Sequence, residues 1–281
     1  MVDIRQTQQY ANYLSKIDWV VERINKINYF IKKFPLIGSV IKIQRPEKIS
    51  YRVIELLSKK YKAFQIILEP KDMVKGRWLM ANGFKLSNSP YLPTKTLQLD
   101  LTKSKNELFN GIKKDARSAI RKKSDLRFMI YDLKDLEEFR NSWKKAIGWR
   151  RYVPPLSHLV ALKKSFKTKA VFFMIQRYIS LYRKKETIAG GIFLTGGRIG
   201  YYWQAFTSSE GRKALAQYKI VWEGIRWAKK MGAKVFDFEG IHDERFPNKS
   251  WLGFTHFKKS FGGYEISYPG TFVKNLLPFG L

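Results

Sequence analysis

The chain contains no cysteine and only three histidines among its 281 residues. It therefore forms no disulfide and offers neither a nucleophilic thiolate nor a zinc–thiolate site. Acidic residues are also scarce: 23 Asp and Glu face 54 Lys and Arg, giving a formal net charge of +31. Such a charge attracts polyanions, namely nucleic acid, anionic lipid or phosphorylated metabolites, although a proteome-wide lysine bias would produce the same composition.

Long apolar runs are missing as well. No stretch approaches the roughly 20 apolar residues that span a bilayer, and the N-terminal MVDIRQTQQYANYL lacks the apolar core of a signal peptide. We therefore expect a cytoplasmic protein, and its charge also suits the anionic inner face of the cell membrane. With 44% hydrophobic and 15% aromatic residues, the sequence can still fill packed cores, and its length favours two domains.

The order of predicted elements after residue 124 is the most informative pattern. It runs through a strand, two helices, three strands, a basic loop, a long helix ending before Gly232, and a further strand, KVFDFEG. This is the order of a GNAT-like acyltransferase fold, in which the long helix directs its free N–H groups at the acyl donor. The first half contains a similar set of strands and helices. We therefore predict an α+β protein with two tandem GNAT-like domains, residues 1–124 and 125–281.

A basic helix is predicted near the end of the first half. Ser104 and Glu107 have the spacing of a capping box, which places a helix start ahead of NELFNGIKKDARSAIRKK. Lys113, Arg117 and Arg121 recur every four residues along it. Such a stripe matches a phosphate backbone and makes these residues candidates for tRNA binding. A solvated helix face would show the same pattern.

An acidic cluster, DFEGIHDE, stands out in this basic chain. It contains Asp237, Glu239, Asp243 and Glu244. We predict no metal site, because these residues and His242 show no recognisable ligand spacing. Asp237 and Glu239 should share one face of a strand. They are candidates for a general base or for an electrostatic role in which they hold nearby cations or an incoming amine.

Two segments, RKALAQYKIVWEGIRWAKKMGAKVFDFEGI and WLGFTHFKKSFGGY, resemble the FemABX family of tRNA-dependent peptidyltransferases. The stretch PTKTLQLDLTKSKNELFNGIKKDARSAIRK is similar to the family's strand and following basic helix. The resemblance covers roughly residues 90–270. It implies two GNAT-like domains, and the absence of a long insertion in the sequence implies the form without a coiled-coil arm.

The resemblance also implies roles for single residues. Lys258 matches the lysine of the family's Phe-Lys pair and is the first candidate for a catalytic cation, with Phe257 beside it able to stack on the terminal adenine of the tRNA. Arg212, at the head of the long helix, matches a position that binds precursor phosphates. Lys42 and Arg45 occupy the place of a further phosphate contact in the first domain.

The implied reaction transfers an amino acid from aminoacyl-tRNA, the donor substrate, to a stem-peptide amine of a peptidoglycan precursor. The acceptor is UDP-MurNAc-pentapeptide or lipid II, no cofactor is needed, and we expect a monomer. Two alternatives stay open. An acyl-CoA-dependent N-acyltransferase of the same fold would need a glycine-rich pyrophosphate loop, where this chain has only Gly211. A non-catalytic RNA-binding protein would explain the basic helix but not the Phe-Lys segment.

Overall fold

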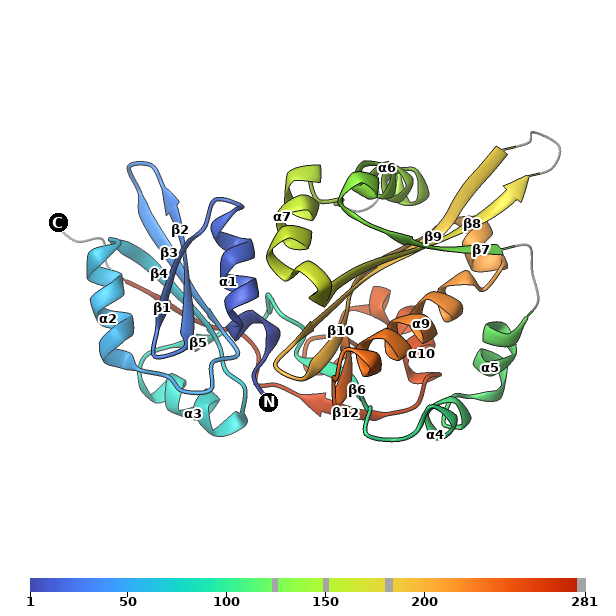
Figure 1. The fold of residues 1–281 in the computed structure, drawn as a ribbon. Coiled ribbons are helices and arrows are strands. Elements are labelled where there is room, and N and C mark those ends of the chain that lie inside the picture. Colours follow the sequence, from blue (N-terminus) through green and yellow to red (C-terminus); the bar gives the residue numbers. More distant parts are fainter. Residues whose placement is uncertain (123–125, 149–151, 180–183, 277–281) are drawn as a thin grey trace. The chain divides into compact units, whose positions relative to one another are not determined.

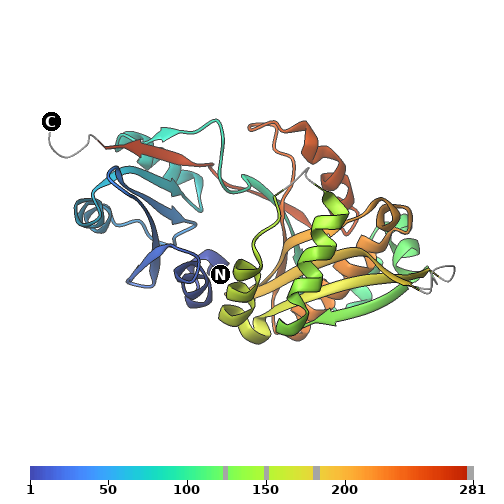
Figure 2. The same cartoon turned by 90° about the horizontal axis from the view of Figure 1, so that it is seen from above.

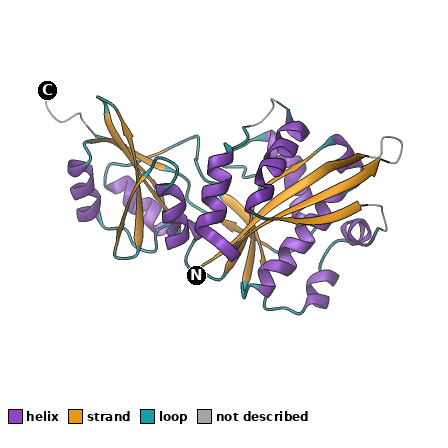
Figure 3. Cartoon of the chain, turned by 45° about the horizontal axis from the view of Figure 1, so that its top comes forward, coloured by secondary structure: helices purple, strands orange, loops and turns teal. Residues whose placement is uncertain are grey.

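The computed structural model describes residues 1–122, 126–148, 152–179 and 184–276, which form two compact units. Unit 1 comprises Met1–Thr96, Gly240–Leu252 and Glu265–Leu281, and unit 2 comprises Leu97–Glu239 and Gly253–Tyr264. Each unit contains one mixed β-sheet flanked by helices (Figure 3), as the predicted α+β class requires.

Unit 1 is built on a six-stranded sheet with the order β1-β2-β3-β4-β13-β5. Tyr29 and Ile31 point to the face covered by α2 and α3, whereas Phe30 points to the other face and meets Tyr10 of α1. The elements are α1 (Gln8–Ser15), β1 (Val20–Ile24), β2 (Ile27–Phe34), β3 (Gly38–Gln44), α2 (Tyr51–Lys60), β4 (Ala63–Glu69), α3 (Met73–Ala81), β5 (Lys85–Leu86) and β13 (Phe272–Asn275).

Unit 2 is built on a seven-stranded sheet with the order β12-β6-β11-β10-β9-β8-β7. Helices α6 and α7 lie over one face and α9 over the other (Figure 1). The elements are β6 (Lys95–Asp100), α4 (Lys105–Asn110), α5 (Lys114–Arg121), β7 (Leu126–Tyr131), α6 (Leu136–Ile147), α7 (Leu156–Phe166), β8 (Ala170–Ile179), β9 (Lys184–Gly196), β10 (Ile199–Thr207), α8 (Ser209–Lys213), α9 (Ala216–Lys230), β11 (Val235–Gly240), α10 (Leu252–Lys259) and β12 (Tyr264–Ser267).

One glycine of β9 and one of α9 allow this helix to pack closely on the sheet. A Cβ atom on Gly191 would lie 2.8 Å from the Ile220 side chain of α9, and one on Gly224 of α9 would lie 2.1 Å from the Phe193 ring. Both distances are too short for carbon atoms in van der Waals contact. Glycine at these two positions therefore sets the distance between the long helix and the strands beneath it.

The division into units differs from the sequence boundary between residues 124 and 125, which falls inside unit 2. The C-terminal strand β13 returns to unit 1, where Phe272 pairs with Leu68 of β4, and Figure 2 shows it in red among the blue and cyan strands. Strand β6 instead joins the unit 2 sheet beside β11. Strand pairing between distant segments, which local patterns do not encode, decides this division.

The predicted basic helix is two helices. The capping box of Ser104 and Glu107 is present and starts α4, but α4 ends at Asn110 and α5 begins only at Lys114. The intervening Lys113 has an extended ψ of 148° and donates its backbone N–H to the Ser260 carbonyl. The predicted helix is thus interrupted at Lys113, whose backbone N–H bonds a distant carbonyl, and Lys113 caps the start of α5, which carries Arg117 and Arg121.

In the described part of the chain, α9 is the longest helix, with 15 residues, so no coiled-coil arm occurs there. No described helix is long and apolar enough to cross a membrane.

Asp243 connects loops within unit 1, and its replacement by Asn is expected to destabilise this unit by about 1–3 kcal/mol. Its carboxylate, 7% exposed, accepts bonds from Thr94 Oγ1 at 2.6 Å and from Arg245 Nη2 at 2.7 Å. Burial works to raise the Asp243 pKa, but these bonds outweigh it, so the pKa is lowered from 3.8. Urea unfolding of Asp243→Asn measures the loss, and Glu244→Gln, an exposed neighbour, should remain within about 0.5 kcal/mol of the parent.

The same bonds predict how this loss varies with pH. A carboxyl group whose pKa is lowered by folding stabilises the protein above its unfolded pKa and loses that contribution as the pH falls through the folded pKa. The difference between parent and Asp243→Asn should therefore shrink on acidification below 3.8. A difference that stays constant from neutral pH to strongly acidic pH would contradict the assigned ionised state.

Candidate functional site

The parallel strands β10 and β11 of unit 2 position the candidate site. They pair over three residues, from Ile199 opposite Val235 to Tyr201 opposite Asp237. Directly after this last pair, the register of β10 against β9 shifts between Tyr202 and Gln204, which marks a β-bulge. Bulges bend a strand and redirect side chains. Tyr202 and Asp237 therefore lie where the paired part of β10 and β11 ends.

Lys258 of α10 is buried at this point, with 9% of its surface exposed. Its Nζ lies 5.0 Å from the centre of the Phe254 ring and 5.9 Å from that of Tyr202. Burial lowers the Lys258 pKa to about 8, whereas the negative charges of Glu239 and Asp237 oppose this shift. An amine with such a pKa can change its protonation state near neutral pH, unlike an exposed lysine.

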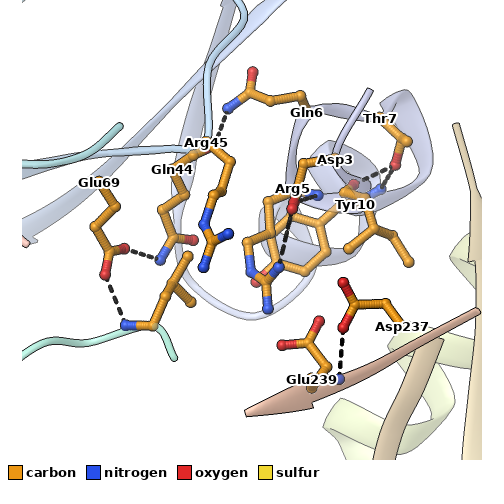
Figure 4. A network of polar contacts seen from close by, with 12 residues as sticks. Asp3, Arg5, Gln6, Thr7, Tyr10, Gln44, Arg45, Glu69, Asp237 and Glu239 are labelled. Carbon is orange, nitrogen blue, oxygen red and sulfur yellow. Dashed lines mark hydrogen bonds and ion pairs between the residues drawn. The ribbon is translucent and has the colours of Figure 1, made fainter. Parts of the chain in front are cut away.

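Asp237 and Glu239 do not simply alternate along β11. Glu239 has a left-handed φ of +59°, and its backbone N–H donates to Asp237 Oδ1 at 2.6 Å (Figure 4). The other Asp237 oxygen accepts a bond from Gln98 Nε2 at 2.8 Å. The left-handed backbone at Glu239 departs from regular strand geometry, so simple alternation does not by itself fix where its side chain points. Both carboxylates nevertheless act electrostatically on Lys258.

The acidic cluster is divided between the two units. Asp237 and Glu239 belong to unit 2, whereas Asp243 and Glu244 belong to unit 1, because the chain leaves unit 2 after Glu239. The negative charges of the first pair act on Lys258. In the second pair, Asp243 forms an ion pair with Arg245, and Glu244 is exposed. The acidic run is therefore shared between the two units. Among the described residues, no group of three or more His, Asp or Glu side chains is placed to hold a metal ion.

Phe257 and Phe261 pack with Tyr218 of α9. The Phe257 ring meets Tyr218 edge-on at 4.8 Å between centroids, and Phe261 stacks on Tyr218 at 5.8 Å. Phe261 is 1% exposed and is therefore a core residue. Phe257 is only half-buried, so one part of its ring remains exposed beside the Lys258 helix. A stacking role for Phe257 remains a proposal.

Arg212 does not lie at the head of the long helix. It belongs to α8, a five-residue helix, and Leu215, in a left-handed conformation, separates α8 from α9. The Arg212 side chain is exposed, and its Nη1 donates to the Thr207 carbonyl at 3.2 Å. Its predicted phosphate contact is untested by this geometry, but any such contact would come from α8.

Lys42 of unit 1 lies between aromatic rings. Its Nζ is 4.5 Å from the centre of the Tyr91 ring and 5.3 Å from that of Trp19. Burial lowers the Lys42 pKa, and the negative charge of Glu69 opposes the shift. Glu69 is itself buried and accepts bonds from the Gln44 side chain (Figure 4) and from the Leu92 backbone, each at 2.7 Å.

The Arg45 side chain, in contrast, makes its contacts with other residues of unit 1. It is buried, its Nη2 donates to the Pro93 carbonyl at 2.7 Å, and its guanidinium carbon lies 3.1 Å from the centre of the Tyr268 ring. These contacts hold the loop after β3 in place. Lys42 is therefore the better placed of the two predicted residues for contact with a bound anion.

The three predicted tRNA-binding residues differ in what they contact. Arg117 Nη1 donates to the carbonyls of Asn110 and Ile112, at 2.8 and 2.6 Å, and thereby closes the end of α4. The Arg121 guanidinium lies 4.7 Å from the centre of the Phe109 ring. Both contacts leave positive charge at the surface, and Lys113 is also exposed.

Sequence patterns alone did not identify several residues around these sites. Tyr202 lines the site beside Lys258, and burial raises the pKa of its hydroxyl, which accepts a bond from Gln217 at 2.7 Å. The other residues that sequence patterns did not identify are Gln98, which bonds Asp237, and Trp19 and Tyr91, whose rings lie beside Lys42. Strand alternation places Gln98 on the polar face of β6, but only the pairing of β6 with β11 brings it to Asp237.

The Lys258 amine is expected to titrate near pH 8, and removal of either neighbouring negative charge should lower this pKa further. Without Glu239 or Asp237, burial opposes protonation with less compensation. NMR titration of ¹⁵N-labelled lysine in Glu239→Gln and Asp237→Asn measures the change, with the exposed Lys259 as internal control. An unshifted Lys258 pKa, close to 10.5, would contradict its burial beside these acids.

Known proteins with the same fold place this geometry in context. The chain is similar to a solved structure described as FemX, with a TM-score of 0.79 and 18% identity, covering 98% of this chain and 92% of that one. It is also similar to the C-terminal domain of a putative lysylphosphatidylglycerol synthetase from Agrobacterium fabrum, with a TM-score of 0.61, 11% identity and coverage of 97% and 89%.

A tandem GNAT protein from the clavulanic acid biosynthesis pathway gives a TM-score of 0.55 at 9% identity, with coverage of 94% and 85%. These likenesses show a fold of two tandem GNAT-like domains, as predicted. A comparison with curated protein sequences finds no match. The sequence pattern of the FemAB family, however, matches residues 134–279, slightly more than half of the chain. The chain therefore belongs to the FemAB family.

Proposed function

We propose that this protein is an aminoacyltransferase that moves an amino acid from aminoacyl-tRNA to the stem-peptide amine of a peptidoglycan precursor. The observation that carries the proposal is Lys258, buried beside Tyr202 under the influence of Glu239 and Asp237. Membership of the FemAB family and the fold shared with FemX support it. The positive charge of +31 suits both tRNA and a diphosphate-bearing precursor.

The reaction is aminolysis of an ester. The nitrogen of the acceptor amine attacks the ester carbonyl carbon, and a C–N bond forms as the carbonyl oxygen gains negative charge. The C–O bond to the tRNA ribose then breaks, the nitrogen loses a proton and the ribose oxygen gains one. Because the ester is already reactive, positioning of the two substrates and stabilisation of the oxyanion supply most of the acceleration.

The described side chains fit separate roles in this reaction. The Lys258 ammonium stabilises the oxyanion, and burial strengthens this interaction because water screens it less. Glu239, which is partly exposed, receives the proton of the attacking amine. Asp237 is held by Gln98 and by the Glu239 backbone, so it acts as a positioning residue that maintains the charge on Lys258.

Substrate binding is assigned to other surfaces of the chain. Lys42 and Arg212 contact the precursor phosphates, and Phe257 contacts the tRNA acceptor end. Lys113, Arg117 and Arg121 contact the tRNA backbone, where each lost phosphate contact reduces the salt dependence of binding. Arg45 supports the Lys42 region through its bonds within unit 1.

A transfer assay tests the proposal. Radiolabelled aminoacyl-tRNAs are offered with UDP-MurNAc-pentapeptide, and separately with lipid II in detergent. Label that moves onto either precursor as an amide supports the proposal and identifies the acceptor. Label that remains on tRNA, while acetyl-CoA supports acylation of an amine, would replace it with an acyl-CoA-dependent activity. Retention of tRNA without transfer of any kind would indicate an RNA-binding protein.

A further inference from the structure

The hairpin between β2 and β3 exposes three apolar side chains at its tip. Phe34, Leu36 and Ile37 have 40%, 108% and 69% of their surfaces exposed, which makes Leu36 as accessible as a side chain can be. Phe34 is anchored against Phe64, with ring centroids 5.9 Å apart. Scattered single apolar residues are ordinary on protein surfaces, but three within four positions at a protruding turn form a local apolar patch.

The backbone of this turn makes the choice of leucine unusual. The Ile37 N–H donates to the Phe34 carbonyl at 3.3 Å, so Phe34 to Ile37 form a β-turn with Pro35 second and Leu36 third. Leu36 has a φ of +64°, the conformation that a type II turn requires at its third position and that glycine or asparagine adopts most easily. A strained, fully exposed leucine at this position points to a role outside the folding of the unit.

Two basic side chains lie close to the tip. Lys33 precedes it on β2, and Lys62 adjoins it because the Ser39 N–H donates to the Lys62 carbonyl at 3.1 Å. Both lysines are exposed, and within the described residues neither has a carboxylate partner. The nearby Glu22 carboxylate is paired with Lys60 at 2.7 Å and also accepts a bond from the Tyr61 hydroxyl. The tip thus presents apolar groups with the two exposed lysines Lys33 and Lys62 beside it.

We propose that the tip of the β2–β3 hairpin, residues 34–37, inserts into the surface of an anionic lipid bilayer. Apolar side chains enter the boundary between headgroups and acyl chains, while lysines behind them contact the anionic headgroups. A protruding apolar turn with two lysines beside it fits an anionic bilayer better than a protein partner, which would have to offer a matching acidic groove. The inference concerns unit 1 alone and does not depend on the transferase activity.

Sedimentation with lipid vesicles tests the inference on the full-length protein. Vesicles of phosphatidylcholine with about one-third phosphatidylglycerol should bind the parent protein, and pure phosphatidylcholine vesicles should bind it more weakly. Leu36→Asn and Ile37→Asn should each lower the partition constant about tenfold on the anionic vesicles. Lys33→Gln should lower it about fivefold on anionic vesicles only.

The variants distinguish insertion of the tip from a loss of folding and from attraction by charge alone. Asparagine accepts a left-handed conformation, so Leu36→Asn should keep or raise the thermal stability, and lost binding would not reflect unfolding. Val74→Asn is the matched control, since Val74 is 68% exposed and lies on α3, beyond the opposite end of β4. Unchanged binding in Leu36→Asn and Ile37→Asn would overturn the inference and leave charge as the attraction. The inference would also be overturned if light scattering showed a dimer of the parent protein without lipid and a monomer of Leu36→Asn.

Discussion

Replacement of Lys258 by alanine is expected to lower kcat for aminoacyl transfer by about 10²–10³-fold, the usual cost of removing one stabiliser of an oxyanion. The side chain is held at one place by the Phe254 and Tyr202 rings, and its charge is maintained by Glu239 and Asp237. Because the interaction arises mainly in the transition state, KM for either substrate should change little. Steady-state transfer kinetics with saturating tRNA measure the effect.

Two further variants test whether the lost rate reflects the charge of Lys258 in the transition state. Lys258→Arg keeps a cation and should recover part of the rate, and its activity should persist at pH values above 8, where the parent lysine loses its proton. Lys259→Ala removes the exposed neighbouring lysine and should retain the parental kcat. An equal loss in Lys259→Ala, or a change confined to KM for tRNA, would indicate that Lys258 binds the acceptor end instead of the transition state.

Truncation of Phe261 to alanine is expected to destabilise unit 2 by about 3–5 kcal/mol, the cost of deleting a large buried aromatic side chain. Phe261 is 1% exposed and stacks on Tyr218, and its ring also meets Phe238 at 5.5 Å and Phe257 at 5.5 Å. It thereby fixes the end of α10, on which Lys258 lies, against α9 and β11. Chemical denaturation followed by circular dichroism measures the loss.

An exposed aromatic residue of the same unit provides the comparison. Tyr152 is 74% exposed, so Tyr152→Ala should change the free energy of unfolding by no more than about 0.5 kcal/mol. Phe261→Leu, which retains much of the volume, should recover part of the stability. If Phe261→Ala were as stable as Tyr152→Ala, the aromatic cluster would not be what holds the Lys258 helix.

Local sequence patterns predicted much of unit 2 because they report interactions between near neighbours. The Ser104–Glu107 capping box starts a helix where expected, and Gly232, with a φ of +82°, follows the end of the long helix. The order of strands and helices after residue 124 likewise identified the GNAT-like fold. The Phe-Lys segment of the resemblance distinguishes Lys258 from the other lysines of the sequence.

Tertiary structure alone decided the rest, since each remaining feature depends on segments far apart in the chain. The bond from Lys113 to Ser260 divides the basic helix, and pairing of β13 with β4 returns the C-terminus to unit 1. The acidic run DFEGIHDE is divided between units because the chain crosses after Glu239. By composition alone, Lys258 cannot be told apart from the many other lysines of the chain. Burial lowers the Lys258 pKa to about 8 against the opposing negative charges of Glu239 and Asp237, and burial is a property of the folded chain.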